Sequence, residues 1–176
     1  GVDAVGAWSK YGPGGHDANG NEIVVAVVDG GVDITHPDLE ANIWVNHGEI
    51  PNNGKDDDNN GFIDDINGWN AYNNTGAVES DYHGTHVAGT VGAVGNNGIN
   101  GTGINWDVKI MAVNGSSGST STVLKAYGYV LKQKQLWLSS HGKQGANVVS
   151  TNSSFGVDYG DCTSNDFPAW NDMYNE

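Results

Sequence analysis

The hydrophobic positions of the chain gather into a few short runs separated by long polar stretches. Residues 22–29 (EIVVAVVD), 107–113 (DVKIMAV) and 146–151 (ANVVST) are rich in β-branched side chains. Nearly continuous apolar runs of this kind are typical of strands buried on both faces, as in parallel sheets. Helical segments between the runs favour βαβ units with right-handed crossovers. We therefore expect an α/β fold with a parallel central sheet.

Three segments have the pattern of helices. The clearest begins in the Ser/Thr cluster 119–122, whose hydroxyls are suited to cap free backbone N–H groups, and repeats apolar residues at helical spacing over 123–131. Residues 83–94 (HGTHVAGTVGAV) are rich in small side chains, so a helix there has to pack tightly against its neighbours. Residues 166–176 have Pro168 near their start, followed by apolar residues at helical spacing, and indicate a helix that has barely begun.

Stretches dominated by Gly, Asn and Asp cover residues 12–21 and 46–80, and we expect loops there. With 37% apolar residues, the 176-residue chain is long enough for one domain or for part of a larger one. A domain is not expected to stop at a helix that has barely begun. We therefore expect residues 1–176 to be the N-terminal part of a single domain, whose remainder was truncated or forms a separate, cleaved chain.

Acidic residues dominate the charge, with 21 Asp and Glu against seven Lys and Arg, which gives a net charge of −14. This balance disfavours nucleic acids and anionic membrane surfaces as partners. No apolar run approaches the length of a membrane span, and no charged and apolar leader precedes Gly1. We expect a secreted, extracellular protein in its mature form. Cys162 is the single cysteine, which in a secreted protein suggests a partner outside this sequence.

Asp29 stands at the end of the first apolar run, directly before Gly30 and Gly31. The carboxyl ends of buried parallel strands meet at the sheet edge where α/β proteins keep their sites. Strand context alone also allows a second interpretation, in which Asp29 caps the turn made with the two glycines.

Further motifs follow Asp29 in the chain, at residues 36–39 (HPDL) and 83–90 (HGTHVAGT). Together with 27–33 (VVDGGVD), they resemble the subtilisin-like serine proteases, the subtilases, which display these motifs in this order around their catalytic Asp and His. The resemblance continues across essentially the whole chain. It implies a three-layer α/β domain, incomplete here, that hydrolyses peptide bonds of a protein or peptide substrate through an Asp–His–Ser triad.

The resemblance makes Asp29 and His83 the first two members of that triad. In the first turn of its helix, His83 would take a proton from a serine hydroxyl during its attack on a carbonyl. Asp29 would hold the imidazole in one tautomer and stabilise the imidazolium that forms. We expect Gly84 and Gly89 to let the helix approach the sheet, and His86 to be a buried structural histidine.

A metal pair is the main alternative for His83 and His86. The usual zinc pair on a helix is spaced four residues apart with a Glu between the histidines, and neither feature is present.

No serine after His83 lies in the Gly-Thr-Ser turn in which the family carries its nucleophile, so the Ser is expected in the remaining part of the domain. The resemblance instead matches Gly115, Ser116 and Ser117 to a strand that pairs with the substrate. It places Ser154, Phe155 and Gly156 on the other side of the bound peptide, which would lie between them as an added strand. The alternative is a Gly/Ser loop and an ordinary strand end. The family's oxyanion-hole Asn also lies later in the chain, so Asn152 is not given that role.

Residues 56–65 (DDDNNGFIDD) alternate oxygen ligands, turn at Gly61 and continue with further acids. Hard oxygen ligands around a sharp Gly turn suit Ca²⁺. The Glu that completes an EF-hand is absent, because residue 67 is Asn, so we predict a calcium loop of a different frame. A solvated acidic loop is the alternative. The candidate ligands are Asp56, Asp58, Asn60, the Phe62 carbonyl, Asp64 and Asp65.

The resemblance implies a second calcium site at Asp38 and the loop 96–100, with Asn97 as a ligand, and a propeptide before Gly1. Two positions depart from the family pattern, since Gly30 stands where relatives have Thr or Ser and Tyr82 where they have a small residue. Neither change removes a proton-transfer group. Two other functions are weighed against the protease: a non-catalytic binding module with the same fold, and a calcium-stabilised structural module.

Overall fold

The computed structural model describes residues 2–99, 101–156 and 167–176. Cys162 and Asn100, to which the sequence analysis gave roles, lie outside the described residues, as does Asp166 at the start of the last predicted helix. The elements in chain order are α1 (Ala4–Tyr11), β1 (Val24–Asp29), the 3-10 helix η1 (Glu40–Asn42), β2 (Gly68–Asn70), α2 (Tyr82–Gly92), β3 (Lys109–Asn114), α3 (Thr120–Ser139), β4 (Val148–Asn152) and α4 (Pro168–Asn175).

The strands form a parallel sheet in the order β2-β3-β1-β4. Strands β1 and β3 lie in its centre, with a register that runs from Val24 opposite Lys109 to Asp29 opposite Asn114. The predicted strands at 22–29, 107–113 and 146–151 are therefore confirmed, each shifted by one or two residues at its ends. The α/β class with a parallel sheet is confirmed as well.

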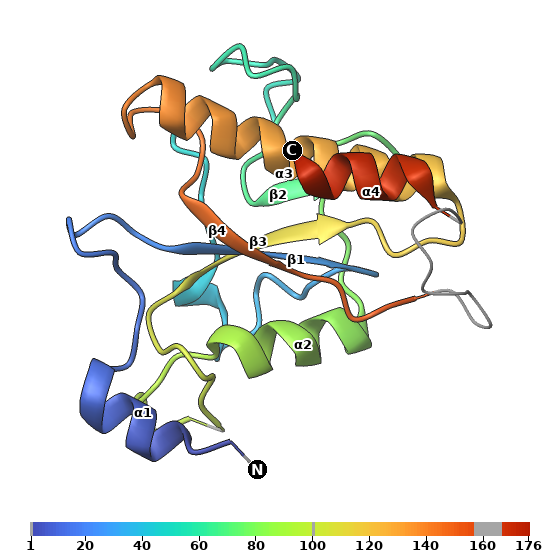
Figure 1. The fold of residues 1–176 in the computed structure, drawn as a ribbon. Coiled ribbons are helices and arrows are strands. Elements are labelled where there is room, and N and C mark those ends of the chain that lie inside the picture. The colour runs from blue at the N-terminus through green and yellow to red at the C-terminus, as the bar shows by residue number, and fades with distance from the viewer. Residues whose placement is uncertain (1, 100, 157–166) are drawn as a thin grey trace.

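Two hydrophobic cores on opposite faces of the sheet explain the continuous apolar runs. Alternate residues of β1 point to opposite faces, so Val28 joins the core beneath α3 while Val27 joins the core beneath α2. Both faces of each central strand are thus covered. Figure 1 shows the three layers, with α2 on one face of the sheet and α3 and α4 on the other.

Helix α3 has the expected apolar face but not the expected cap. Its buried residues include Val123, Ala126 and Val130, which lie on the face toward the sheet. Ser119 makes no side-chain cap to the helix, and its hydroxyl pairs with that of Ser121 at 2.9 Å. The prediction of hydroxyl capping at this end is therefore wrong at Ser119.

Two elements lie within or beside regions that the sequence left as loops. Strand β2 interrupts the predicted loop 46–80, and it pairs with the end of β3. Helix α1 was not predicted, although Ala4, Ala7, Trp8 and Tyr11 recur at helical spacing in it; it is only eight residues long, and none of them is buried. A residue far along the chain supports this helix, since the rings of Trp8 and Trp106 pack edge to face with their centroids 5.1 Å apart.

The fourth strand is an edge of the sheet with little cover. Only its first residue, Val148, is buried, and Val149 is 55% exposed. The expected C-terminal helix is present as α4, which packs on α3 through the rings of Tyr174 and Tyr127. Among the described residues, no helix has both the length and the apolar character that a membrane crossing requires.

Candidate active site

Asp29 and His83 are brought together by the close approach of α2 to the end of β1. Asp29 is the last residue of β1 and is buried. Helix α2 begins one residue before His83 and is capped by Asp81, whose carboxylate accepts the Gly84 N–H at 3.0 Å. Gly84 is required here, because a Cβ at this position would overlap the carbonyl oxygen of Gly31. The small-residue pattern of the helix thus serves to place His83 against β1.

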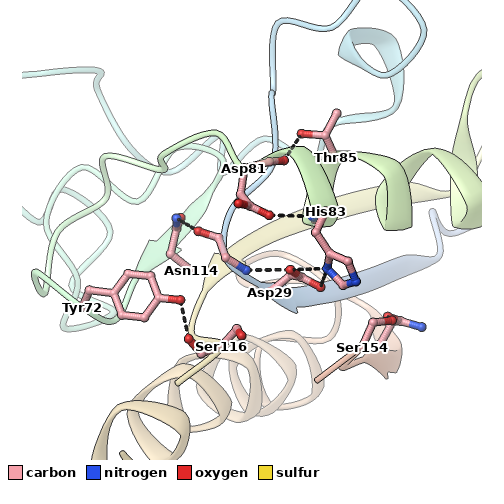
Figure 2. Close-up of polar contacts among 11 residues, drawn as sticks. Asp29, Tyr72, Asp81, His83, Thr85, Asn114, Ser116 and Ser154 are labelled. Atoms are coloured by element: carbon pink, nitrogen blue, oxygen red, sulfur yellow. Dashed lines mark hydrogen bonds and ion pairs between the residues drawn. The ribbon is translucent and has the colours of Figure 1, made fainter. Parts of the chain in front are cut away.

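The two side chains form a direct hydrogen bond (Figure 2). Nδ1 of His83 lies 2.9 Å from one carboxylate oxygen of Asp29 and 3.1 Å from the other. The Asp29 side chain is 4% exposed, whereas that of His83 is 58% exposed. The hydrogen bond to Asp29 and the charge of this carboxylate raise the pKa of His83 above its usual value. With Nδ1 engaged, Nε2 is the nitrogen left for proton transfer.

Asn114 is a site residue that the sequence analysis missed. It ends β3 directly beside Asp29 in the register, and it is fully buried. Its amide donates to the Gly30 carbonyl at 2.7 Å, and its side-chain oxygen accepts the Glu79 N–H at 3.2 Å. It therefore ties the turn after β1 to the segment before α2. The rule that placed Asp29 at the sheet edge applies equally to Asn114 and would have found it.

The segments expected to bind substrate extend past the ends of β3 and β4, on the two sides of β1. The N–H groups of Gly115 and Ser116 both donate to the Asp29 carbonyl, at 2.8 and 3.1 Å. On the other side, the Ser154 hydroxyl donates to the side-chain oxygen of Asn152 at 2.9 Å, and Phe155 packs against the core. Figure 2 shows Ser116 and Ser154 to either side of the Asp29–His83 pair. Substrate binding by these residues and by Ser117 and Gly156 stays a prediction.

Two expectations for α2 are wrong. His86 is exposed rather than buried, and it lines a cavity of about 580 Å³ with Asp33 and Asp38. A Cβ on Gly89 would meet no atom within 4 Å, so this glycine is not what brings the helix close to the described part of the sheet. The possible metal ligands that lie close to His83 are Asp29 and Asp81, and His86 is not among them. The geometry therefore gives no support to a metal pair of His83 and His86.

The acidic loop gathers a different set of carboxylates from the one predicted. Ligand oxygens of Glu49, Asp58 and Asp65 lie within 4.8 Å of one another. Glu49 was missed, because it precedes the acidic run, although its carboxylate accepts the N–H groups of residues 57, 58 and 64. Asp56 and Asp64 instead accept backbone N–H groups of the loop itself. The structure therefore brings together only part of the predicted ligand set.

Asp65 lies at the centre of this cluster and is fully buried. Burial raises its pKa to about 7 despite the donors around it. Those donors are the amides of Asn46, Asn60 and Gln133 and the hydroxyl of Tyr129. Among the described residues, no Lys or Arg forms an ion pair with Asp65.

The chemistry of this cluster fits a hard cation. Carboxylate oxygens are ligands that Ca²⁺ prefers, and a bound cation would compensate the buried negative charge. The amides of Asn46 and Asn60 turn their nitrogens toward these carboxylates, so the carboxylates are the candidate ligands. The side-chain oxygen of Gln133 is also buried without a hydrogen-bond partner. Phe62 closes the loop over the core, where its ring meets those of Trp69 and Tyr129 at 4.8 Å each.

The second predicted calcium site has a different geometry. One carboxylate oxygen of Asp38 accepts the amide of Asn97 at 2.7 Å, and the other accepts the Gly101 N–H at 3.3 Å. No group of three acidic, His or Cys ligands forms around Asp38 within the described residues. Calcium binding at Asp38 and Asn97 stays a prediction.

The comparisons with known proteins agree with the α/β fold. The model of the subtilase family matches residues 20–176, and the chain therefore belongs to this family. The chain is 42% identical over 118 residues to subtilisin-like protease 1 of Plasmodium berghei, a match that covers 62% of the chain and 19% of that protein.

Two further relatives give similar matches. Subtilisin-like protease 1 of Plasmodium vivax is 47% identical over 89 residues, covering 49% of the chain and 14% of the relative. An extracellular protease of Xanthomonas campestris is 39% identical over 114 residues, covering 61% of the chain and 18% of the relative. The matched part is thus less than a fifth of the length of each of these relatives.

Proposed function

We propose that the protein to which this chain belongs is a serine endopeptidase and that Asp29 and His83 are two members of its catalytic triad. The observation that carries the proposal is the hydrogen bond between the buried Asp29 carboxylate and Nδ1 of the exposed His83, at the carboxyl end of a parallel sheet. Membership in the subtilase family supports it. The proposal concerns the complete protein, because the chain spans only a small part of its relatives.

The geometry defines the role of each group. Asp29 accepts the Nδ1–H of His83 and so leaves Nε2 free of its proton in the resting state. Nε2 takes the proton of the serine hydroxyl as its oxygen bonds to the substrate carbonyl carbon, and Asp29 stabilises the imidazolium. His83 then gives this proton to the leaving amine, and water attacks the acyl-enzyme by the same route. Peptide hydrolysis needs no further reactant.

We place the serine in the remaining part of the domain, outside residues 1–176. The bare edge strand supports this arrangement, since β4 has four of its five residues partly or fully exposed in a parallel sheet. Such strands are normally covered on both faces, so further chain is expected to cover β4. The substrate would lie as an added strand between the segments 115–117 and 154–156.

Calcium is proposed at Glu49, Asp58 and Asp65, with Asn60 beside them. The support is the convergence of these carboxylates around the buried Asp65, which forms no ion pair with a Lys or Arg of the described residues. The ion would supply positive charge that holds the loop 49–65 on the core, and no step of the proposed reaction uses it. We also propose that the protein is secreted and made with a propeptide. The extracellular relative from Xanthomonas campestris and the acidic composition support secretion.

The test is peptide hydrolysis by the complete protein and by its His83→Ala variant. The variant should lose essentially all activity, because the residual rate would come only from substrate binding and oxyanion stabilisation. His141→Ala is the matched control, since His141 lies in an exposed turn after α3. Undiminished activity of His83→Ala would refute the proposal. A wild-type protein without activity or a triad Ser would favour the non-catalytic binding module.

A further inference from the structure

Tyr72 follows β2 at the point where this strand leaves the sheet. The backbone pairing of β2 with β3 continues as far as the N–H of Ala71, which donates to the Asn114 carbonyl at 2.9 Å. The chain then turns away, because the side-chain oxygen of Asn70 accepts the N–H groups of Tyr72 and Asn73. Asn70 is fully buried, so this turn is firmly held. β2 therefore has no backbone donor for the next carbonyl along β3.

The side chain of Tyr72 supplies the missing donor. Its hydroxyl donates to the Ser116 carbonyl at 2.6 Å, as Figure 2 shows. The carbonyls of Asn114 and Ser116 both face β2, since Ala71 donates to the first and Tyr72 to the second. The C=O and N–H of one trans peptide bond point in opposite directions, so the N–H of Ser117 faces away from Tyr72, on the side of β1. The phenol thus extends the sheet by one hydrogen bond beyond the last backbone pair.

We propose that Tyr72 is a positioning residue for substrate binding, which fixes the Ser116 carbonyl and with it the peptide bond to Ser117, so that the Ser117 N–H is presented to the substrate. This inference rests on the proposed protease function and on the role of these residues in pairing with the peptide. Tyr72 itself touches neither the scissile bond nor the Asp29–His83 pair. It acts through the conformation of the segment.

The segment needs such a support because its sequence is flexible. Residues 115–119 (GSSGS) have the composition of a flexible linker, and ordering such a chain costs conformational entropy. The described contacts hold its start through Asp29 and its end through the Ser117 hydroxyl, which accepts the Ser119 N–H at 3.0 Å. Tyr72 holds the middle.

The hydroxyl stays a donor over a wide pH range. Partial burial raises the pKa of Tyr72, and the charges of Asp29, Asp81 and Glu79 raise it further. The phenol therefore keeps its proton in the range in which His83 titrates, so the hydrogen bond to Ser116 is not lost when the charge of His83 changes.

The experiment compares wild type with Tyr72→Phe in the complete protein, using two substrates with the same scissile bond. The long substrate has several residues on each side of the bond, and the short one ends too early to reach the segment 115–117. Loss of one neutral hydrogen bond is expected to raise KM for the long substrate about 3- to 10-fold. Its kcat should stay the same, because the lost binding is equal in ground and transition states. The short substrate should be unaffected.

Tyr11→Phe is the matched control, since Tyr11 is 76% exposed at the end of α1. It should leave KM and kcat unchanged for both substrates. If Tyr72 had a merely structural role, Tyr72→Phe would change the kinetic constants of both substrates equally. That result, or no change for either substrate, would overturn the inference. A wild-type protein that cleaves neither substrate would instead overturn the proposed function and, with it, this inference. The two failures are distinguishable, because only the second appears in the wild type.

Discussion

Gly84→Ala tests the contact that brings Asp29 and His83 together. A Cβ on Gly84 would overlap the Gly31 carbonyl oxygen and would lie 3.0 Å from the Cβ of Asp29. Restoring ordinary contact distances requires α2 to move from the end of β1 by about 1 Å. Overpacking of this kind costs about 1–3 kcal/mol, while Ala in place of Gly favours the helix by about 1 kcal/mol. We expect a net loss of stability of up to about 2 kcal/mol.

The same movement should reduce activity more than stability. Nδ1 of His83 lies 2.9 Å from a carboxylate oxygen of Asp29, so a movement of α2 away from β1 by about 1 Å breaks this hydrogen bond. Misplacement of a catalytic group by about 1 Å can lower kcat/KM about 100-fold. Urea unfolding followed by Trp fluorescence measures the stability of the complete protein, and peptide hydrolysis measures the activity.

Gly128→Ala is the matched control for this variant. Gly128 lies inside α3, and a Cβ there would meet no atom within 4 Å. The control should gain up to about 1 kcal/mol from helix propensity and keep full activity. If Gly84→Ala behaves like Gly128→Ala in both assays, the reasoning about close approach of α2 is wrong.

Three further predictions concern other parts of the structure. Asp29→Asn should lower kcat about 10⁴-fold. Because Asp29 raises the pKa of His83, the acid limb of the kcat/KM profile should also move to lower pH, and an unmoved limb would contradict the assignment. A hundredfold excess of calcium over its Kd should stabilise the protein by about 2.7 kcal/mol, as read from unfolding with and without chelator. Asp65→Asn should abolish this calcium effect and the exposed Glu40→Gln should keep it, whereas equal calcium effects in both would count against the site. Trp69→Ala should cost about 3–5 kcal/mol in urea unfolding, because this ring is 6% exposed among other aromatic rings, and a cost below about 1 kcal/mol would contradict its place in the core.

The central strands could be predicted because each follows from a local pattern, whereas the pairing of Asp29 with His83 was predicted from the resemblance to the subtilases. β1 and β3 are apolar throughout because both of their faces are covered, and that condition is visible in the sequence itself. Asp29 ends such a strand, and His83 lies in the motif 83–90, whose His is paired in the subtilases with the Asp of the motif 27–33. The ends of the strands in the structure differ from the predicted ends by only one or two residues.

The remaining features depend on contacts between residues that lie far apart in the sequence. Glu49 joins the acidic cluster through the folding of the loop, and no spacing rule connects it to Asp65. Strand β2 is only three residues long and forms because the end of β3 offers it a partner. Tyr72 gains its role from a turn set by Asn70, so nothing in its neighbouring residues distinguishes it from an ordinary loop tyrosine.

The most direct test of the account is covalent labelling of the complete protein with a serine-directed fluorophosphonate, followed by peptide mapping of the labelled residue. We predict a single labelled Ser outside residues 1–176, with labelling lost in His83→Ala because the serine then has no base. A label on a Ser within these residues, such as Ser116, or labelling that is undiminished in His83→Ala, would contradict it.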